Sequence, residues 1–207
     1  MSDALVVDHS EPAIESVYNG KLAMWLFLCS EVMFFSGLLG AYIALRLGNP
    51  GLFAADQQEV HVHVHLAAFN TILLIGSSLT MALAVLNAQQ KNTAKQRLFL
   101  LMTAAMGALF ICLKFYEYNH HFHDISPYQD PSLPPVGIWP RTSIYFAFYY
   151  GLTGVHAFHI IGGIIPIMGL WWFAKKKDVS YETEMVGLYW HFVDLVWIFL
   201  FPLLYLI

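Results

Sequence analysis

The chain has 207 residues, of which 58% are hydrophobic and 12% are charged, and its formal net charge is −4. Soluble domains carry roughly a quarter of charged residues, so this composition excludes an ordinary water-soluble fold. A weakly acidic chain also gives no reason to expect nucleic acid as a partner. The composition therefore predicts a membrane protein.

Apolar stretches recur five times along the chain, and most reach the ~20 residues that a helix needs to cross a bilayer. They cover Leu22–Leu45, Ala67–Leu86, Leu98–Leu113, Ile144–Phe173 and Met185–Ile207. The third is the shortest, because Lys114 and Glu117 follow it. A helix from Gln96 to Tyr118 would still span if those charged groups faced protein or the membrane interface. We predict an all-α fold, a polytopic bundle of five spanning helices.

The basic residues are distributed unevenly between the helix ends. Those on one side are Lys21, Lys91, Lys95, Arg97, Lys175, Lys176 and Lys177, whereas the other side has Arg46 and Arg141. The positive-inside rule then places the N-terminus in the cytoplasm and the C-terminus outside. The first twenty residues are polar and acidic without a cleavable signal, so we expect a polar tail over 1–20 before one membrane domain over 21–207.

Two short features have modest structural interpretations. Cys29 and Cys112 are the only cysteines and both lie in apolar helices, which predicts small buried core residues and no disulfide framework. The run Lys175–Lys177 is typical of a stop-transfer anchor, and contact with anionic lipid head groups is compatible with it.

Ionisable residues within the spans are the main functional candidates, because a charged group at the bilayer centre costs roughly 2.5–3.5 kcal/mol. Glu31 lies about ten residues into the first span, near mid-membrane. Its carboxyl group can hydrogen-bond to another helix or take part in proton exchange. The residues alone leave both interpretations open.

Histidines in the last two spans form two further pairs. His156 and His159 stand three residues apart and share a helix face, which suits either a metal or hydrogen bonds between helices. His191 and Asp194 have the same spacing, and the carboxylate could fix the imidazole tautomer. This second pair is either structural or accessible to protons.

A metal or redox centre is poorly supported by the sequence. Glu117 and His120 match the Glu-x-x-His spacing of di-metal bundles, but those sites need two copies and this chain has one. The histidines in the spans are too few for a haem with a copper site. We therefore expect no catalytic, cofactor-binding or metal residues, and a membrane subunit or proton-handling protein.

Five segments, taken in order, resemble subunit III of the haem-copper terminal oxidases, the cytochrome c and quinol oxidases. They are Trp25–Gly37 with its glutamate, the hydroxyl-rich Asn70–Thr80, the aromatic Lys114–Tyr118, the histidine-bearing Phe148–Gly163, and Tyr189–Trp197. The likeness extends over roughly Leu22 to Ile207. It corresponds to the five-helix bacterial form, since two helices of the seven-helix form have no counterpart here.

The resemblance implies a non-redox subunit of a proton-pumping oxidase that carries out aerobic respiration. Haem and copper would lie in partner subunits, with direct packing on subunit I, association with subunit II and the others, and bound phospholipid between helices. Cytochrome c or quinol would be met only through the complex. A buried polar network, near lipid or handling protons, would comprise Glu31, Glu117, His156, His159, His191 and Asp194.

Three other functions compete with this interpretation. A subunit-III-like partner of a nitric oxide reductase would share the fold. An independent membrane metalloenzyme would use Glu31, Glu117, His120, His156 and His159. A proton-coupled transporter would use Glu31 with the His191–Asp194 pair, although no inverted repeat is visible.

Overall fold

The computed structural model describes residues 12–48, 64–125 and 143–206, and the regular structure in these ranges is entirely α-helical. The helices are α1 (Pro12–Gly48), α3 (Val64–Gln89), α4 (Thr93–Ile125), α5 (Ser143–Phe173) and α6 (Ser180–Tyr205). Each one is long and apolar enough to cross a bilayer. The predicted all-α fold with five spanning helices is confirmed.

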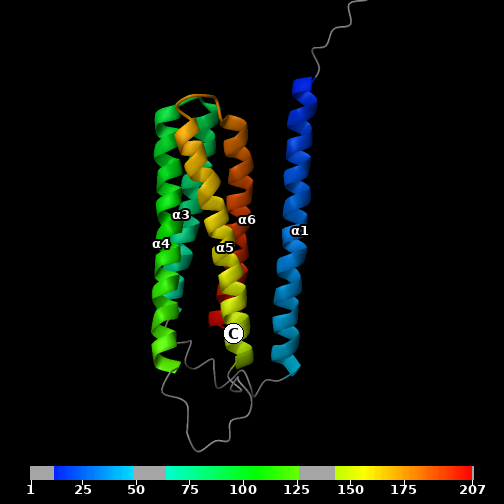
Figure 1. Ribbon diagram of the computed structural model, residues 1–207, viewed down its shortest axis with the longest axis vertical. Coiled ribbons are helices and arrows are strands. Elements are labelled where there is room, and N and C mark those ends of the chain that lie inside the picture. The colour runs from blue at the N-terminus through cyan, green and yellow to red at the C-terminus, as the bar shows by residue number, and fades with distance from the viewer. Residues whose placement is uncertain (1–11, 49–63, 126–142, 207) are drawn as a thin grey trace, which may run out of the picture.

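Four of the helices form an antiparallel bundle and the first stands beside it (Figure 1). α3 packs against α4 and α6, and α5 packs against the same two helices. The connections over 90–92 and 174–179 are short, as expected for antiparallel neighbours. α1 contacts only α5 and α6 substantially. We call the end of the molecule at which α1 begins the proximal end, and the opposite end the distal end.

The third predicted span is long enough to cross a bilayer only if it includes the charged residues Lys114 and Glu117. α4 supplies an apolar span from Thr93 to Asn119. Lys114 and Glu117 near its distal end are 2% and 0% exposed, so both face the interior of the bundle. The longer helix from Gln96 to Tyr118 is therefore correct, and for the expected reason.

The first helix is longer than the sequence pattern indicated. It begins at Pro12, so residues 12–20 of the expected polar tail are helical and residues 1–11 lie outside the described part of the chain. Proline is favoured in the first turn of a helix. The apolar stretch thus begins inside the helix and not at its first residue.

The prediction that both cysteines are buried was wrong. Cys29 on α1 and Cys112 on α4 are exposed on the outside of the molecule. A thiol is a small, weakly polar group that lipid accommodates as well as a protein core does. In a span that is apolar on every side, the residue type does not reveal which face meets protein.

Trp190 of α6 is fully buried, and the four helices of the bundle pack tightly around it. Its indole nitrogen donates a hydrogen bond to the Ser77 hydroxyl on α3 at 3.0 Å. Glycines admit the ring on both sides: a Cβ at Gly107 of α4 would stand 2.7 Å from it, and a Cβ at Gly163 of α5 would stand 2.8 Å from it. Small residues at helix contacts let the four backbones approach around this side chain.

α1 meets the bundle along a narrow seam. Leu28, Phe35 and Tyr42, spaced seven residues apart, are 7%, 3% and 0% exposed. Their large neighbours Met33 and Leu47 are 75% and 77% exposed. A seven-residue spacing is typical of helices that cross at a small left-handed angle. Among the described residues, α1 therefore touches the other helices with one face.

Replacing Gly163 by alanine should lower the free energy of unfolding by about 1–3 kcal/mol, because the new methyl group overlaps the Trp190 ring in a packed core. Gly154→Ala on the same helix is the matched control, since its Cβ would meet nothing within 4 Å. Unfolding in mixed micelles, followed by circular dichroism, measures both. Equal stability of the two variants would contradict the packing of Trp190 described above.

Candidate functional site

The distal half of the bundle contains a buried cluster of charged and phenolic side chains. Glu117 on α4 accepts hydrogen bonds from Tyr149 of α5 at 2.6 Å, Tyr205 of α6 at 2.7 Å and Lys114 at 3.0 Å. The two hydroxyl groups also lie 2.8 Å from each other. One carboxylate therefore joins three helices.

Lys114 supplies the positive charge of this cluster. Its ammonium group donates to Glu117 and to the Tyr205 hydroxyl. It also lies 4.8 Å from the ring centre of Trp197 and 5.0 Å from that of Tyr205, where the aromatic faces attract a cation. The ion pair is electrically neutral as a unit, which is the form in which two charges are tolerated in a membrane interior.

Glu31 and His159 form a second pair, between α1 and α5. The Glu31 carboxyl oxygen lies 3.1 Å from Nε2 of His159. The other ring nitrogen, Nδ1, lies 2.8 Å from the carbonyl oxygen of Val155. The two side chains are 19% and 15% exposed, so this pair sits at the edge of the α1 seam.

Both ring nitrogens of His159 are engaged. The Val155 carbonyl oxygen can only accept, so Nδ1 is the donor in that hydrogen bond. Nε2 faces the Glu31 carboxyl group, and this contact links α5 to α1.

The His191–Asp194 pair is arranged differently from the sequence-based expectation. Nδ1 of His191 lies 2.6 Å from the Ser78 hydroxyl of α3. Asp194 is 5% exposed and lies close to the same hydroxyl, yet neither of its carboxyl oxygens makes a well-formed hydrogen bond to another described residue. Ser78 thus stands between the two residues and connects α3 to α6.

His156 is fully enclosed and separate from its neighbour His159. Its ring stacks on Trp197 with 5.1 Å between ring centres and meets the edge of Phe110 at 5.8 Å. Within the described ranges neither ring nitrogen has a hydrogen-bond partner. The same indole ring also lies 4.8 Å from the Lys114 ammonium group, so His156 and the ion-pair cluster share Trp197 as a neighbour.

The six residues predicted as one polar network occupy distinct places. The structure brings Glu31 and His159 together, and it places Ser78 between His191 and Asp194. No hydrogen bond between described residues joins the Glu117 cluster to these groups. The partners Tyr149, Tyr205 and Ser78 were not singled out from sequence, and nothing local marks them. The three-residue spacing of Lys114 and Glu117 was visible and could have indicated an ion pair.

The residues proposed for a metalloenzyme do not converge. Glu117 is occupied by Lys114 and two tyrosines, and Glu31 contacts His159, whereas the ring nitrogens of His156 have no partner among the described residues. Among the side chains that the structure describes, no three His, Cys, Asp or Glu residues gather as metal ligands would. The side chain of His120 lies outside the described set.

These features define a multi-pass helical membrane protein in which Lys114 pairs with Glu117 and Glu31 pairs with His159 inside the spans. The sequence profile of the family described as cytochrome c oxidase subunit III matches residues 5–207. The chain therefore belongs to the cytochrome c oxidase subunit III family. This result confirms the resemblance drawn from its five segments.

Individual relatives match over nearly the whole chain. Cytochrome c oxidase subunit 3 of Thermostichus vulcanus is 31% identical over 99% of this chain and 94% of its own length. The protein of the same name from Bacillus subtilis is 32% identical over 91% and 86%. Quinol oxidase subunit 3 of Bacillus spizizenii is 29% identical over 89% and 85%.

Removing one member of the buried ion pair should be far more damaging than removing both. Glu117→Leu leaves the Lys114 charge uncompensated and should cost about 3–5 kcal/mol of unfolding free energy. The double variant Lys114→Met with Glu117→Leu should cost much less than the sum of the single changes. Reversible unfolding of the four proteins of this cycle measures the coupling.

The matched control for this cycle is the partly exposed pair of Lys21 and Glu184, whose charged atoms lie 2.9 Å apart. Its removal should change stability by less than about 1 kcal/mol, because solvent screens the interaction. Additive effects at Lys114 and Glu117 would show that the two side chains do not form an ion pair.

The Glu31–His159 contact should determine the position of α1. Glu31→Gln keeps a hydrogen-bond donor for Nε2 of His159 and should preserve the position of α1. Glu31→Ala should weaken the docking of α1 by about 1 kcal/mol, which is typical of hydrogen bonds between helices in membranes. Spin labels on the native exposed thiols Cys29 and Cys112 report the α1–α4 distance by pulsed electron resonance. We expect a broader distribution for Glu31→Ala only; an unchanged distribution would mean that the contact is not needed.

Proposed function

We propose that this chain is the non-redox subunit III of a proton-pumping haem-copper terminal oxidase of aerobic respiration. The match of the family profile to residues 5–207 carries the proposal. Its two ion-pair sites support a structural role, because Glu117 and Glu31 are each committed to side chains of this same chain. The catalytic centre, with its haem and copper, belongs in this proposal to partner subunits.

The partners follow from the same assignment. The chain packs directly on oxidase subunit I and belongs to a complex with subunit II and further subunits. Relatives are named both cytochrome c oxidase and quinol oxidase subunit 3, and either donor reduces the complex without touching this chain. Phospholipid fills spaces between its helices, and the chain helps to sustain proton uptake by the catalytic subunit.

The orientation in a bacterial inner membrane is part of the proposal. Most of the basic residues belong to the proximal ends of the helices and to the short connections there (Figure 1). They are Lys21, Lys91, Lys95, Arg97 and Lys175–Lys177. Arg46 lies in the last turn of α1 at the distal end. The positive-inside rule makes the proximal end, with the N-terminus, cytoplasmic.

Purification through a tag on this chain in mild detergent tests the assignment. We expect larger subunits to co-purify in equal amounts, together with a reduced-minus-oxidised difference spectrum of haem. Deleting the chain should leave the haem spectrum of the remaining complex intact but shorten its active lifetime during turnover, since the chain supports the catalytic subunit without supplying its cofactors.

The tagged Gly154→Ala variant is a suitable control, because the substitution meets nothing within 4 Å and should purify with the same partners. A colourless preparation without partner subunits would refute the oxidase assignment. Loss of the haem spectrum on deletion of the chain would instead refute its non-redox role.

A further inference from the structure

A small polar group interrupts the apolar outer surface of α3 and α6 near the middle of the membrane. His191 lies near the centre of the 26-residue span of α6, and Ser78 lies near the centre of the 26-residue span of α3. Both side chains are partly buried, and Nδ1 of His191 lies 2.6 Å from the Ser78 hydroxyl. Lipid offers no hydrogen-bond partner at this depth, so a polar atom that faces it is costly.

The second ring nitrogen of His191 is such an atom. Nε2 forms no hydrogen bond to another described residue, and it is not one of the enclosed polar atoms that lack a partner. It therefore reaches the outer surface of the bundle. α1 leaves it uncovered, because α1 packs on the neighbouring face of α6, where Phe35 meets Phe192 with 6.2 Å between ring centres.

The side chains that flank this nitrogen are apolar and exposed. Ile75 precedes Ser78 by one turn of α3, and Leu195 follows His191 by one turn of α6. They are 53% and 52% exposed. We call the surface formed by Ile75, Ser78, His191 and Leu195 the α3–α6 seam. An apolar strip with one polar atom at its centre suits contact with another spanning helix, since such helices associate through close packing and hydrogen bonds.

Asp194 influences which chemical group fits the seam. It is buried close to the same Ser78 hydroxyl. The single hydrogen of that hydroxyl can point to Nδ1 of His191 or to Asp194. In the first case Nε2 of a neutral imidazole donates, and in the second case it accepts. A hydroxyl or carboxamide group both donates and accepts, so it fits either arrangement.

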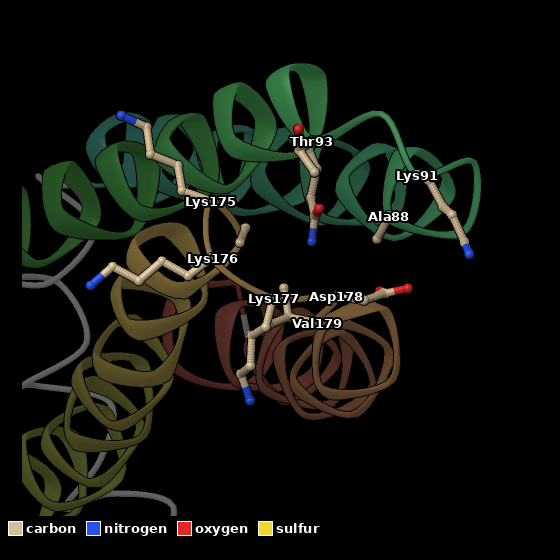
Figure 2. A pocket seen from close by; sticks show the side chains of 10 residues that line it. Ala88, Lys91, Thr93, Lys175, Lys176, Lys177, Asp178 and Val179 are labelled. Carbon is tan, nitrogen blue, oxygen red and sulfur yellow. The ribbon is translucent and has the colours of Figure 1, made fainter.

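The charged side chains at the proximal end of the bundle do not converge in this way. A cavity of about 400 Å³ lies there between the α3–α4 turn and the α5–α6 connection. Figure 2 shows that Lys91, Lys175 and Lys176 point away from one another around it. The Asp178 carboxylate is already bonded to the backbone nitrogen of Ser180 at 3.0 Å. Polar atoms thus come together at the α3–α6 seam and diverge at the proximal cavity.

We infer that the α3–α6 seam docks a spanning helix of another polypeptide, which presents a Ser, Thr, Asn or Gln side chain to Nε2 of His191. Lipid head groups remain at the membrane surface, so a spanning helix is what brings such a group to this depth. Ile75 and Leu195 pack against the partner helix, and the hydrogen bond fixes its depth. The inference rests on the proposed function in one respect, because the partner is taken to be a subunit of the same complex.

Photo-crosslinking of the full chain in its native membrane tests the seam. A benzophenone amino acid replaces Leu195 or Ile75, on either side of the outward nitrogen. We expect both probes to attach to one spanning segment of a co-purifying subunit, within about one turn of a Ser, Thr, Asn or Gln residue. The matched control is Leu109 of α4, which is 45% exposed and lies at a similar depth, since its neighbour Phe110 contacts Trp197 of α6. A probe at Leu109 should not attach to that segment.

The hydrogen bond is tested with two substitutions of similar size at one position. His191→Leu removes the outward nitrogen and should lower the crosslink yield from Leu195 about threefold to tenfold, as expected for one hydrogen bond between spanning helices. His191→Gln keeps a group that donates and accepts, so it should retain most of the yield. Replacing the polar residue of the partner segment by alanine should cause the same loss with this chain unchanged, which separates docking from misfolding of the His191→Leu variant.

Three results would overturn the inference: attachment only to lipid or detergent, attachment to a second copy of this chain, or equal yields from His191→Leu and His191→Gln. The haem spectrum of the tagged preparation scores the oxidase assignment separately. Haem without the expected crosslinks would refute the docking seam alone. Crosslinks to a partner in a colourless preparation would support the seam and refute the oxidase assignment.

Discussion

The buried ion pair of Lys114 and Glu117 is the contact around which three helices of the bundle are arranged. Lipid offers no hydrogen-bond partner, so a charge on a spanning helix must be neutralised within the protein. Glu117 neutralises Lys114 from one turn away on the same helix. Tyr149 and Tyr205, on two other helices, donate hydrogen bonds to its carboxylate. The cluster thus ties α4, α5 and α6 into one register at the distal end.

The attachment of α1 follows the same physical rule at three depths. Lys21 meets Glu184 at the proximal end, and Glu31 meets His159 in the middle. Near the distal end, the Tyr42 hydroxyl donates to the Leu203 carbonyl at 3.4 Å. Since lipid removes most of the hydrophobic drive for helices to associate, these polar contacts and the narrow seam hold the helix in place.

The division of the polar residues into separate groups bears on the function. Connected ionisable groups across the bundle would suit a proton relay through this chain. Instead, Glu117 is held in an ion pair, Glu31 contacts His159, and His156 is enclosed by aromatic rings. Among the described residues these groups thus make separate local contacts.

Sequence alone determined the number of spanning helices and the family, and it stated the condition on Lys114 and Glu117 under which the third helix would span. Hydropathy, chain length and the cost of charge in lipid act locally, so they can be read along the chain. Tertiary structure alone decided which polar groups meet, that Cys29 and Cys112 face outwards, and that α1 stands beside the bundle. The reason is physical: spans that are apolar all round carry no amphipathic pattern, so only the contacts between helices distinguish the face that meets protein from the face that meets lipid.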